Sequence, residues 1–440
     1  MKRKFFLSLL VFLLLALNIA IAQTGDSLLG EATLQNCIQY ALKKQPAINQ
    51  SQIDELVADR EIKSKLADWL PQLNLYANYQ NSFILQEIPF GSQIVKTGTY
   101  NSSTAQFSLT QTIFDRDVLL ARTSAKDVRT QFKQFTISNK IDLVANVSKA
   151  FYDVLLSKKQ IELIDQDILL LERSAKDAYN QYKGGVVDKT DYQRATITLN
   201  NAKAQRKNSE EQLKSKYASL KLLMSYPANE ELDLYYDSAK LVQEVLAIDT
   251  TSQVNFDNRI EYQLLKTQRK LLEANLRYYK WGFLPSLSAF GQYNLNYFSN
   301  DFVKMYNDNF PNAYAGVSLS FPIFQGTKRS QQIRIAQLEL RRLDYDFIAV
   351  KDSIVAQHIQ VLANYKSNLA NYFVQKENLE LAKEVYNIIQ LQYRSGVKTY
   401  LDVITANNDL FSAQINYLDA AFQVLTNKID VERSLGILQY

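Results

Sequence analysis

The stretch ISNKIDLVANVSKAFYDVL, residues 137–155, lies inside a run of nearly seventy residues, from Asp115 to Lys183, that contains neither glycine nor proline. Within it, side chains suited to a helix seam recur at alternating steps of three and four residues. They are Ile137, Ile141, Val144, Ser148, Phe151 and Leu155. Since glycine and proline are the residues that end helices, the run predicts one very long helix with coiled-coil-like packing.

A second run of this kind extends from Thr327 to Ser395. Its apolar seam also steps by three and four residues, through Leu340, Leu343, Phe347, Val350 and Ile354. At 1.5 Å per residue each run would form a rod on the order of 100 Å long. A compact globular domain has no room for such a rod, whereas a duct across a periplasm requires one.

The two runs belong to a tandem repeat with a period of about 211 residues. Three pairs of segments carry it: WLPQL (69–73) with FLPSL (283–287), SLTQTIF (108–114) with SLSFPIF (318–324), and YKGGV (182–186) with YRSGV (393–397). We therefore divide the chain into a first repeat (23–226), a joining segment read as a small collar (227–257) and a second repeat (258–440). Each repeat is expected to contain a helix, two strands and a long helical hairpin.

Four segments of about ten residues alternate apolar and polar side chains with a period of two, the pattern of a strand. They begin near Leu73, Ala105, Leu287 and Val317. The apolar positions suit lipid and the polar ones a watery lumen, as in an outer-membrane β-barrel. The alternative is a soluble sheet with one buried face.

The number of strands limits the oligomeric state of such a barrel. Four strands cannot close, and open sheet edges cannot face lipid. Two copies would give eight strands, whose interior fills with side chains, whereas three copies give twelve and leave a passage. The expected fold is therefore mainly α with β: long antiparallel helical hairpins forming a tunnel, and a 12-stranded barrel made by a homotrimer.

The N-terminus has the features of a secretory signal peptide. Three basic residues, Lys2 to Lys4, precede an apolar run and the small-x-small sequence that ends at Ala22. We expect cleavage after Ala22, the alternative being an uncleaved anchor. No later segment offers eighteen consecutive apolar residues, so a membrane span would have to consist of strands. Removing residues 1–22 also removes three of the cations behind the net charge of +5.

The residues needed for catalysis or metal binding are scarce. His358 is the only histidine, and its place on the helix seam favours a packing role. Gly184-Gly185 lacks the Lys and Ser/Thr of a phosphate loop. The basic residues are spread along the chain rather than grouped into a nucleic-acid groove. We therefore expect no enzyme activity, no cofactor, no metal and no nucleic-acid partner.

The duplicated plan, the Leu-Pro strand entries and the Tyr-x-x-Gly turns closely resemble the TolC family of outer-membrane efflux proteins. The most specific segment is YRSGVKTYLDVITA, residues 393–406. The resemblance extends from about Thr33 to Leu438. It implies a homotrimeric exit duct without catalytic activity, embedded in outer-membrane lipid and extending into the periplasm. Its partners would be a periplasmic adaptor and an inner-membrane pump of the RND, ABC or MFS type.

The same resemblance implies a gate at the periplasmic end, made by the two hairpin turns of each protomer. The family's latch tyrosine falls on Tyr393 and its acidic partner on Asp191. The basic latch residue falls on Lys398, facing Thr190. An acidic ring around the pore falls on Asp402.

Two features of this sequence qualify the implied gate. Thr405, which is not acidic, stands where the family has a second acidic ring, so the sequence departs from the family's pattern of two rings. Lys398 replaces an arginine of the type member and lacks the planar fork that binds two acceptors. From the residues alone, Gly185 and Gly396 would end the long helices at positive φ, and Lys398 and Asp402 would be ordinary solvated side chains.

The resulting hypothesis is a passive, gated exit duct that conducts small molecules or polypeptides across the periplasm and outer membrane. The alternative is a periplasmic coiled-coil scaffold or adaptor without a barrel. The alternating strands distinguish the two hypotheses, because an adaptor needs no apolar stripe facing lipid.

Overall fold

The computed structural model describes residues 29–236 and 253–440. The expected signal peptide, with its cleavage after Ala22, lies outside the described residues, as does the middle of the joining segment. Among the residues that are described, no helix is both long and apolar enough to cross a membrane.

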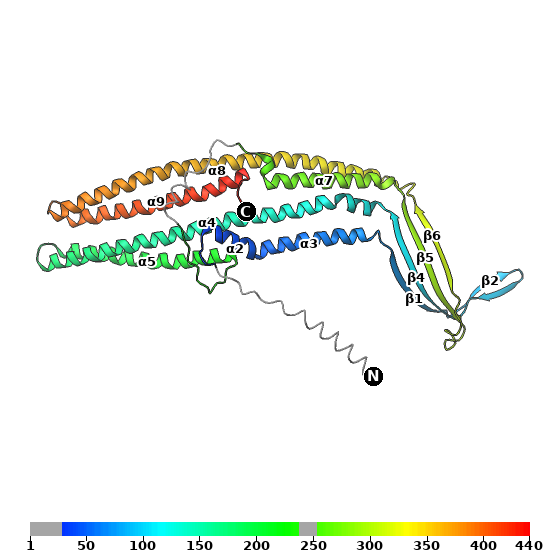
Figure 1. The fold of residues 1–440 in the computed structure, drawn as a ribbon. Coiled ribbons are helices and arrows are strands. Elements are labelled where there is room, and N and C mark those ends of the chain that lie inside the picture. Colours follow the sequence, from blue (N-terminus) through cyan, green and yellow to red (C-terminus); the bar gives the residue numbers. More distant parts are fainter. Residues whose placement is uncertain (1–28, 237–252) are drawn as a thin grey trace.

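Two very long helices form the backbone of the molecule (Figure 1). Helix α4 spans Arg116–Lys183 with 68 residues, and α8 spans Lys328–Arg394 with 67 residues. The side chain of Asp115 caps the start of α4 by accepting a hydrogen bond from the amide of Asp117. Both long helices predicted from the absence of glycine and proline are confirmed.

Each long helix is accompanied by shorter helices of its own repeat, three along α4 and two along α8 (Figure 1). The first repeat contributes α2 (Leu34–Lys44), α3 (Pro46–Ala67) and α5 (Lys189–Met224). The second contributes α7 (Ile260–Lys280) and α9 (Tyr400–Leu435). Helices α5 and α9 form hairpins with α4 and α8 at the end far from the sheet, while α3 and α7 lead into strands.

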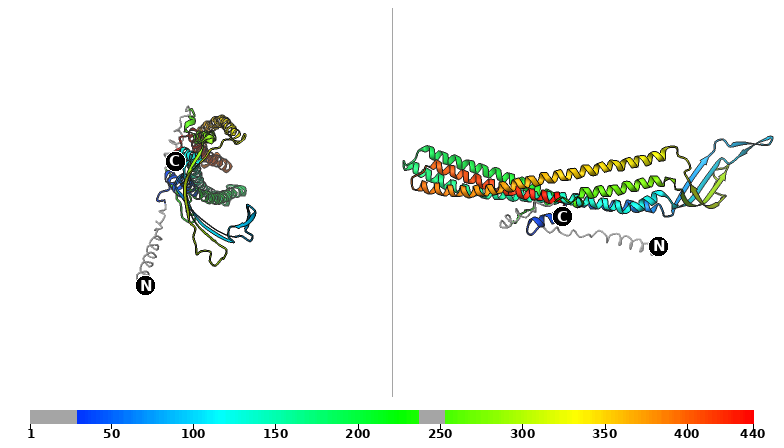
Figure 2. Two further views of the ribbon diagram at one scale, coloured as in Figure 1. Left: turned by 90° about the vertical axis from the view of Figure 1, so that its right-hand side faces the viewer. Right: turned by 90° about the horizontal axis from the view of Figure 1, so that it is seen from above.

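A four-stranded antiparallel sheet caps the other end of the helical body (Figure 2). It consists of β1 (Gln72–Asn81), β4 (Asn101–Phe114), β5 (Ser286–Ser299) and β6 (Asn312–Ser320), in the order β1-β4-β5-β6. Each repeat therefore supplies two of its strands, as predicted, and β4 pairs with β5 across the repeats.

A short hairpin, β2 (Gln86–Phe90) and β3 (Gln93–Thr97), projects beyond the sheet between β1 and β4 (Figure 1). The sequence analysis did not predict it. Its strands have five residues each, and Pro89 interrupts the alternating pattern used to find the longer strands.

Buried side chains on α8 repeat every seven residues along its middle, at His358, Tyr365, Tyr372 and Leu379. The predicted seam residues Leu343 and Ile354 are buried too. A spacing of seven residues keeps one face of a long helix turned toward its neighbours.

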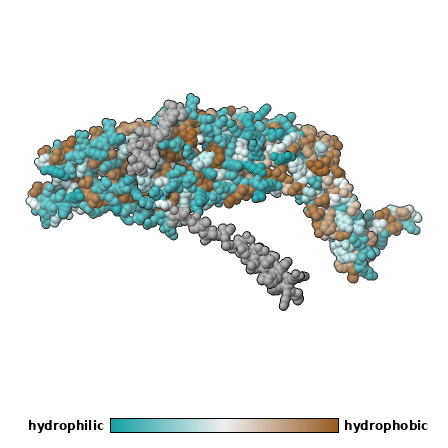
Figure 3. Space-filling view, viewed as in Figure 1, coloured by the Kyte–Doolittle hydropathy of each residue, from teal (hydrophilic) through white to brown (hydrophobic). Residues whose placement is uncertain are grey.

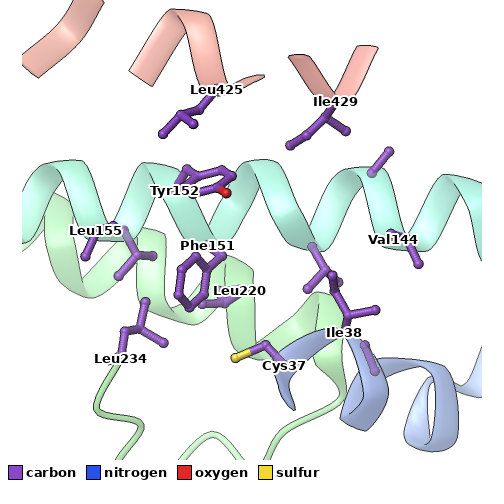
Figure 4. Close-up of a cluster of buried hydrophobic side chains, with 14 of the residues drawn as sticks. Cys37, Ile38, Val144, Phe151, Tyr152, Leu155, Leu220, Leu234, Leu425 and Ile429 are labelled. Carbon is purple, nitrogen blue, oxygen red and sulfur yellow. The ribbon is translucent and has the colours of Figure 1, made fainter. Parts of the chain in front are cut away.

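The main hydrophobic core lies midway along the molecule, where α2, α4, α5 and α9 meet (Figure 4). Phe151 and Cys37 are fully buried in it. Burial raises the pKa of the Cys37 thiol to about 12, so this cysteine is a packed, unreactive side chain. The core fixes the N-terminal helix α2 against the long helix of the same repeat.

The shorter helices meet end to end beside this core. Helix α5 stops at Ser225, which adopts a left-handed conformation, and its hydroxyl donates a 2.7 Å hydrogen bond to Gln45 just before α3. In the second repeat, α9 stops at Gly436, with a φ of 71°, directly against Asn258 and the start of α7. We call these two places the first and second joints.

The second joint contains a buried polar network. The guanidinium of Arg259, which is 3% exposed, donates to the backbone oxygen of Ser434 at 2.8 Å and to Glu261 at 3.1 Å. His358 Nδ1 lies 2.8 Å from the Ser434 hydroxyl. Burial, with the charge of Arg259 adding to it, lowers the pKa of His358. The single histidine therefore takes part in packing at a helix joint, in agreement with the sequence analysis.

The second joint is expected to be sensitive to any side chain at Gly436. A Cβ there would lie 2.6 Å from the Asn258 oxygen, and the positive φ adds strain. Gly436→Ala should lower the free energy of unfolding by about 1–3 kcal/mol, measured by thermal circular dichroism. Gly396→Ala is the matched control, since its φ is 79° but nothing lies within 4 Å. Equal losses in both variants would show that the close contact contributes nothing.

Candidate functional site: the hairpin tips and the sheet surface

Both helical hairpins turn through a glycine in the left-handed conformation. Gly185 has a φ of 74° and Gly396 a φ of 79°. The amide of Val186 donates to Gln181 O at 2.9 Å, and that of Val397 donates to Gln392 O at 2.9 Å. These are the long-range bonds of the Schellman motif, which satisfies the last carbonyl groups of a helix. The predicted helix-ending role of both glycines is confirmed.

The two tips of one protomer pack on each other through small and aromatic side chains. Ala178, Ala195 and Tyr400 are buried, with Tyr192 and Tyr393 packed against them. The Tyr393 and Tyr400 rings lie 6.2 Å apart. Burial raises the pKa of Tyr400 to about 12, so its hydroxyl stays neutral at all physiological pH values. The tips therefore form a small second core, separate from the main one.

The latch tyrosine is placed at this contact, but with a different partner from the one inferred. The hydroxyl of Tyr393 donates to Gln181 Oε1 at 3.2 Å. Asp191 lies in the first turn of α5, where its amide bonds to Asp188 O. Within the protomer, the hydrogen bond from Tyr393 on α8 to the uncharged side-chain amide of Gln181 on α4 therefore joins the two hairpins.

Lys398 and Asp402 are brought together on one helix start. Their charged groups lie 3.9 Å apart, with both side chains more than one third exposed. Lys398 therefore pairs with Asp402, whereas the resemblance had it facing Thr190 in the first turn of α5. An exposed pair of this kind contributes little to stability.

Asp402 also closes a capping box. Its carboxylate accepts bonds from the Thr399 amide at 2.9 Å and the Thr399 hydroxyl at 2.8 Å, and its own amide bonds back to that hydroxyl. These bonds, with Lys398 adding to them, lower the pKa of Asp402. Thr405, one turn further on, bonds to the Leu401 carbonyl oxygen. The residue inferred to ring the pore thus has a local structural role as well.

Some residues at the tips were missed by the sequence analysis. Gln181 and Tyr400 form the contact between the hairpins, and Asn407 on α9 donates a 2.7 Å hydrogen bond to Asp167 on α4. Burial raises the pKa of Asp167. The concentration of tyrosines next to both glycine turns was the available signal for the tip core. Nothing in the sequence pattern marks Gln181 or Asp167.

At the middle of the two central strands, apolar side chains are more exposed than polar ones, which is the opposite of the order in a water-soluble protein. In the central strands, the apolar Leu109 and Tyr293 are each 46% exposed, whereas the polar Ser108 and Asn294 are 6% and 8% exposed. Figure 3 shows brown, apolar surface over this end of the molecule and mostly teal surface along the helices. A soluble sheet that buries its apolar face is thereby contradicted.

Among residues 29–236 and 253–440, no group of three or more His, Cys, Asp or Glu side chains is arranged to hold a metal ion.

Comparison with solved structures finds the same fold in outer-membrane channels. The superposition on CusC has a TM-score of 0.73 and 15% identity, covering 91% of each chain. The Campylobacter jejuni channel CmeC gives a TM-score of 0.73 at 14% identity, covering 92% of this chain and 85% of that one. The fold is that of a TolC-like outer-membrane channel.

The chain belongs to the outer membrane efflux protein family, whose model matches residues 37–225 and 258–437. TolC of Escherichia coli is 23% identical over 97% of this chain and 86% of its own length. OprJ of Pseudomonas aeruginosa is 20% identical over 93% of this chain and 85% of its own length. The two matched segments coincide with the tandem repeat.

The protein is accordingly an exit duct of the Gram-negative outer membrane with a periplasmic portion, and its family is a transport family, not an enzyme family. The alternative of a scaffold without a membrane part is not supported.

The capping box makes the start of α9 sensitive to acid. Because the folded state lowers the pKa of Asp402, its stabilisation is complete above the unfolded value of about 3.9 and is lost as the pH falls through the folded pKa. Hydrogen exchange, corrected for intrinsic rates, should show protection of the first turn of α9 falling in this range. Asp402→Asn should abolish that dependence, whereas Asp191→Asn, at the equivalent position of α5, should preserve it. Unchanged acid sensitivity in Asp402→Asn would contradict the assignment.

Proposed function

We propose that three copies assemble around a threefold axis, close a 12-stranded barrel in the outer membrane and enclose a helical tunnel in the periplasm. The observation that carries this proposal is the exposed apolar face of the sheet. It is supported by the sheet order, in which β1 and β6 each pair on one side only. Unpaired strand edges are not stable in lipid, and pairing β6 of one protomer with β1 of the next satisfies both.

In this assembly the duct passively conducts cargo delivered by a periplasmic adaptor and an inner-membrane pump of the RND, ABC or MFS type. The length of α4 and α8, on the order of 100 Å, supports a reach deep into the periplasm. The names of similar proteins, such as the solvent efflux pump outer membrane protein SrpC of Pseudomonas putida, support a place in a multi-component efflux system. The chain acts without catalysis and without a cofactor.

The N-terminal 22 residues act as the signal peptide, removed after Ala22. Residues 227–257 act as a collar joining the repeats. The described part of residues 227–257 supports the proposed collar, because Leu234 is buried in the main core and forms a β-bridge with Ala32.

The hairpin tips act as the gate. The bond from Tyr393 to Gln181 fastens α8 to α4 in each protomer. A net contribution of about 1 kcal/mol for such a bond becomes about 3 kcal/mol over three copies. That is enough to keep a resting channel mostly closed, so an adaptor opens it by binding the open form more tightly. Asp402 contributes one carboxylate per protomer to a ring around the pore, and Asp191, Thr190 and Lys398 take part in the contact between the two hairpins.

The barrel can be tested by placing a charge on the apolar face. Leu109→Lys would expose a lysine to hydrocarbon at a cost of roughly 2–4 kcal/mol per subunit, so membrane insertion and the heat-stable trimer on gels should decrease. Gln106→Lys, which adds the same charge on the opposite face, is the matched control and should insert. Normal insertion of Leu109→Lys would refute the orientation of the sheet.

The gate can be tested by single-channel recording. Tyr393→Phe with Lys398→Ser should raise the conductance of the resting trimer and make cells leaky to large antibiotics, because the bond from Tyr393 to Gln181 and the proposed contact of Lys398 with Thr190 are lost.

Two single variants identify the partner of the tyrosine. Gln181→Leu should open the channel as much as Tyr393→Phe, and combining them should add nothing, since both remove one bond. Asp191→Asn should open it only if the carboxylate binds across the trimer interface. An intact trimer with wild-type conductance in all of these variants would remove the tips from the gate.

A further inference from the structure

The four long strands contain no charged side chain. Their sequences are QLNLYANYQN in β1, NSSTAQFSLTQTIF in β4, SLSAFGQYNLNYFS in β5 and NAYAGVSLS in β6. The helices differ sharply, since α4, α5, α8 and α9 carry charged residues throughout their length. Charge is expected to be absent from a face that contacts lipid, but the neutrality extends to the polar face as well.

The strand register shows which side chains share the polar face of the sheet. In the middle of this face they carry only amides, hydroxyls and aromatic rings. Its members include Asn74, Asn78, Thr104, Gln106, Ser108, Gln292, Asn294, Asn296, Asn312, Tyr314 and Ser318. A watery pore tolerates charged side chains on its wall, so nothing in the folding of the sheet excludes them there.

Several of these polar groups bind one another across the strands. Thr104 donates to Asn296 Oδ1 at 3.0 Å, and Asn294 donates to Asn312 Oδ1 at 2.8 Å. The Tyr314 hydroxyl donates to Gln292. Donors and acceptors that are already paired offer a passing molecule only weak, short-range interactions.

Aromatic surface is part of the same face. The ring of Phe290 lies over Gly316, where a Cβ would come within 2.8 Å of it, and the Tyr314 ring is 6.4 Å away, edge to face. The glycine allows the ring to lie against the sheet instead of standing up from it. The wall therefore combines uncharged polar groups with flat apolar patches.

We propose that the polar face of the sheet lines a charge-neutral exit, which accepts anionic, cationic and uncharged cargo alike and leaves all selection by charge to the helical part of the duct. This inference rests on the proposed closed barrel. Its physical basis is that fixed charges in a water-filled passage with low-dielectric walls attract one sign of cargo and repel the other, whereas paired dipoles act only at short range. The cargo would pass along the sheet without meeting a charged binding ring, since the charges of Asp301, Lys304 and Asp308 lie beyond the strands, in the loop between β5 and β6.

The test compares block of single trimers in planar bilayers by two trivalent ions, hexaamminecobalt(III) and hexacyanoferrate(III). The mature protein is added to one chamber, so the charged helical body stays there, and each ion is added to the opposite chamber, on the sheet side. Neither ion should block the wild-type channel at the sheet, and any block by the cation at the proposed Asp402 ring should disappear in Asp402→Asn. Asn78→Asp should be blocked by the cation and Asn78→Lys by the anion, each with an affinity about tenfold above wild type.

Controls separate the inference from the fold and from the proposed duct. Glu87→Gln changes the charge of the β2–β3 hairpin, outside the sheet, and should behave as wild type. Asn74→Asp and Asn74→Lys repeat the test on the same face if the Asn78 variants fail to give a heat-stable trimer. Block from the sheet side by either ion that is as strong as in the charged variants and persists in Asp402→Asn would overturn the neutral exit. Charged variants that are blocked no more strongly than wild type would also overturn the neutral exit. Intact trimers without any conductance would refute the duct itself, and this inference with it.

Discussion

An unbroken ladder of backbone hydrogen bonds along α4 and α8 is the constraint on which the rest of the molecule depends. Each helix runs for more than sixty residues without a proline, which lacks the backbone N–H that a helix needs, and without a glycine, which weakens a helix. Because these helices span the whole helical body, the shorter helices need only pack against one half each. The sheet and the hairpin tips, the two places where function is expected, are thereby held far apart by a continuous element.

The second organising feature is a change of solvent along the molecule. The helical body buries Phe151, Tyr365 and Val424 and presents charged side chains to water, whereas the sheet leaves its apolar residues exposed. The hydrophobic effect acts in both parts, but at the sheet the favourable surroundings for Leu109 lie outside the protein. One chain therefore follows two opposite patterning rules, and the boundary falls where helices α3 and α7 enter strands.

Much of this fold could be predicted from the sequence, because the signals were long and repeated. Runs without glycine or proline gave both long helices nearly to the residue, and the alternation of side chains identified the four strands of the sheet. The β2–β3 hairpin was missed because strands of five residues containing a proline carry little periodic signal. At the tips, the glycine turns followed from residue type alone. The partner of Tyr393 did not, since the side chain that meets its hydroxyl depends on how the two hairpins pack on each other, which no local pattern encodes.

The position of the two joints has a consequence for how such a chain arises. Each repeat starts at mid-height, travels to the sheet, returns the full length to a tip and ends again at mid-height, so its last residue lies where the next repeat begins. A gene for one repeat can therefore be copied in tandem and joined by a short linker without moving any element. In the proposed trimer, six separate half-length chains would trace the same ring as three whole ones. The fused form has the advantage that the halves are free to diverge, which has happened at Ser225 and Gly436, the matching ends of α5 and α9.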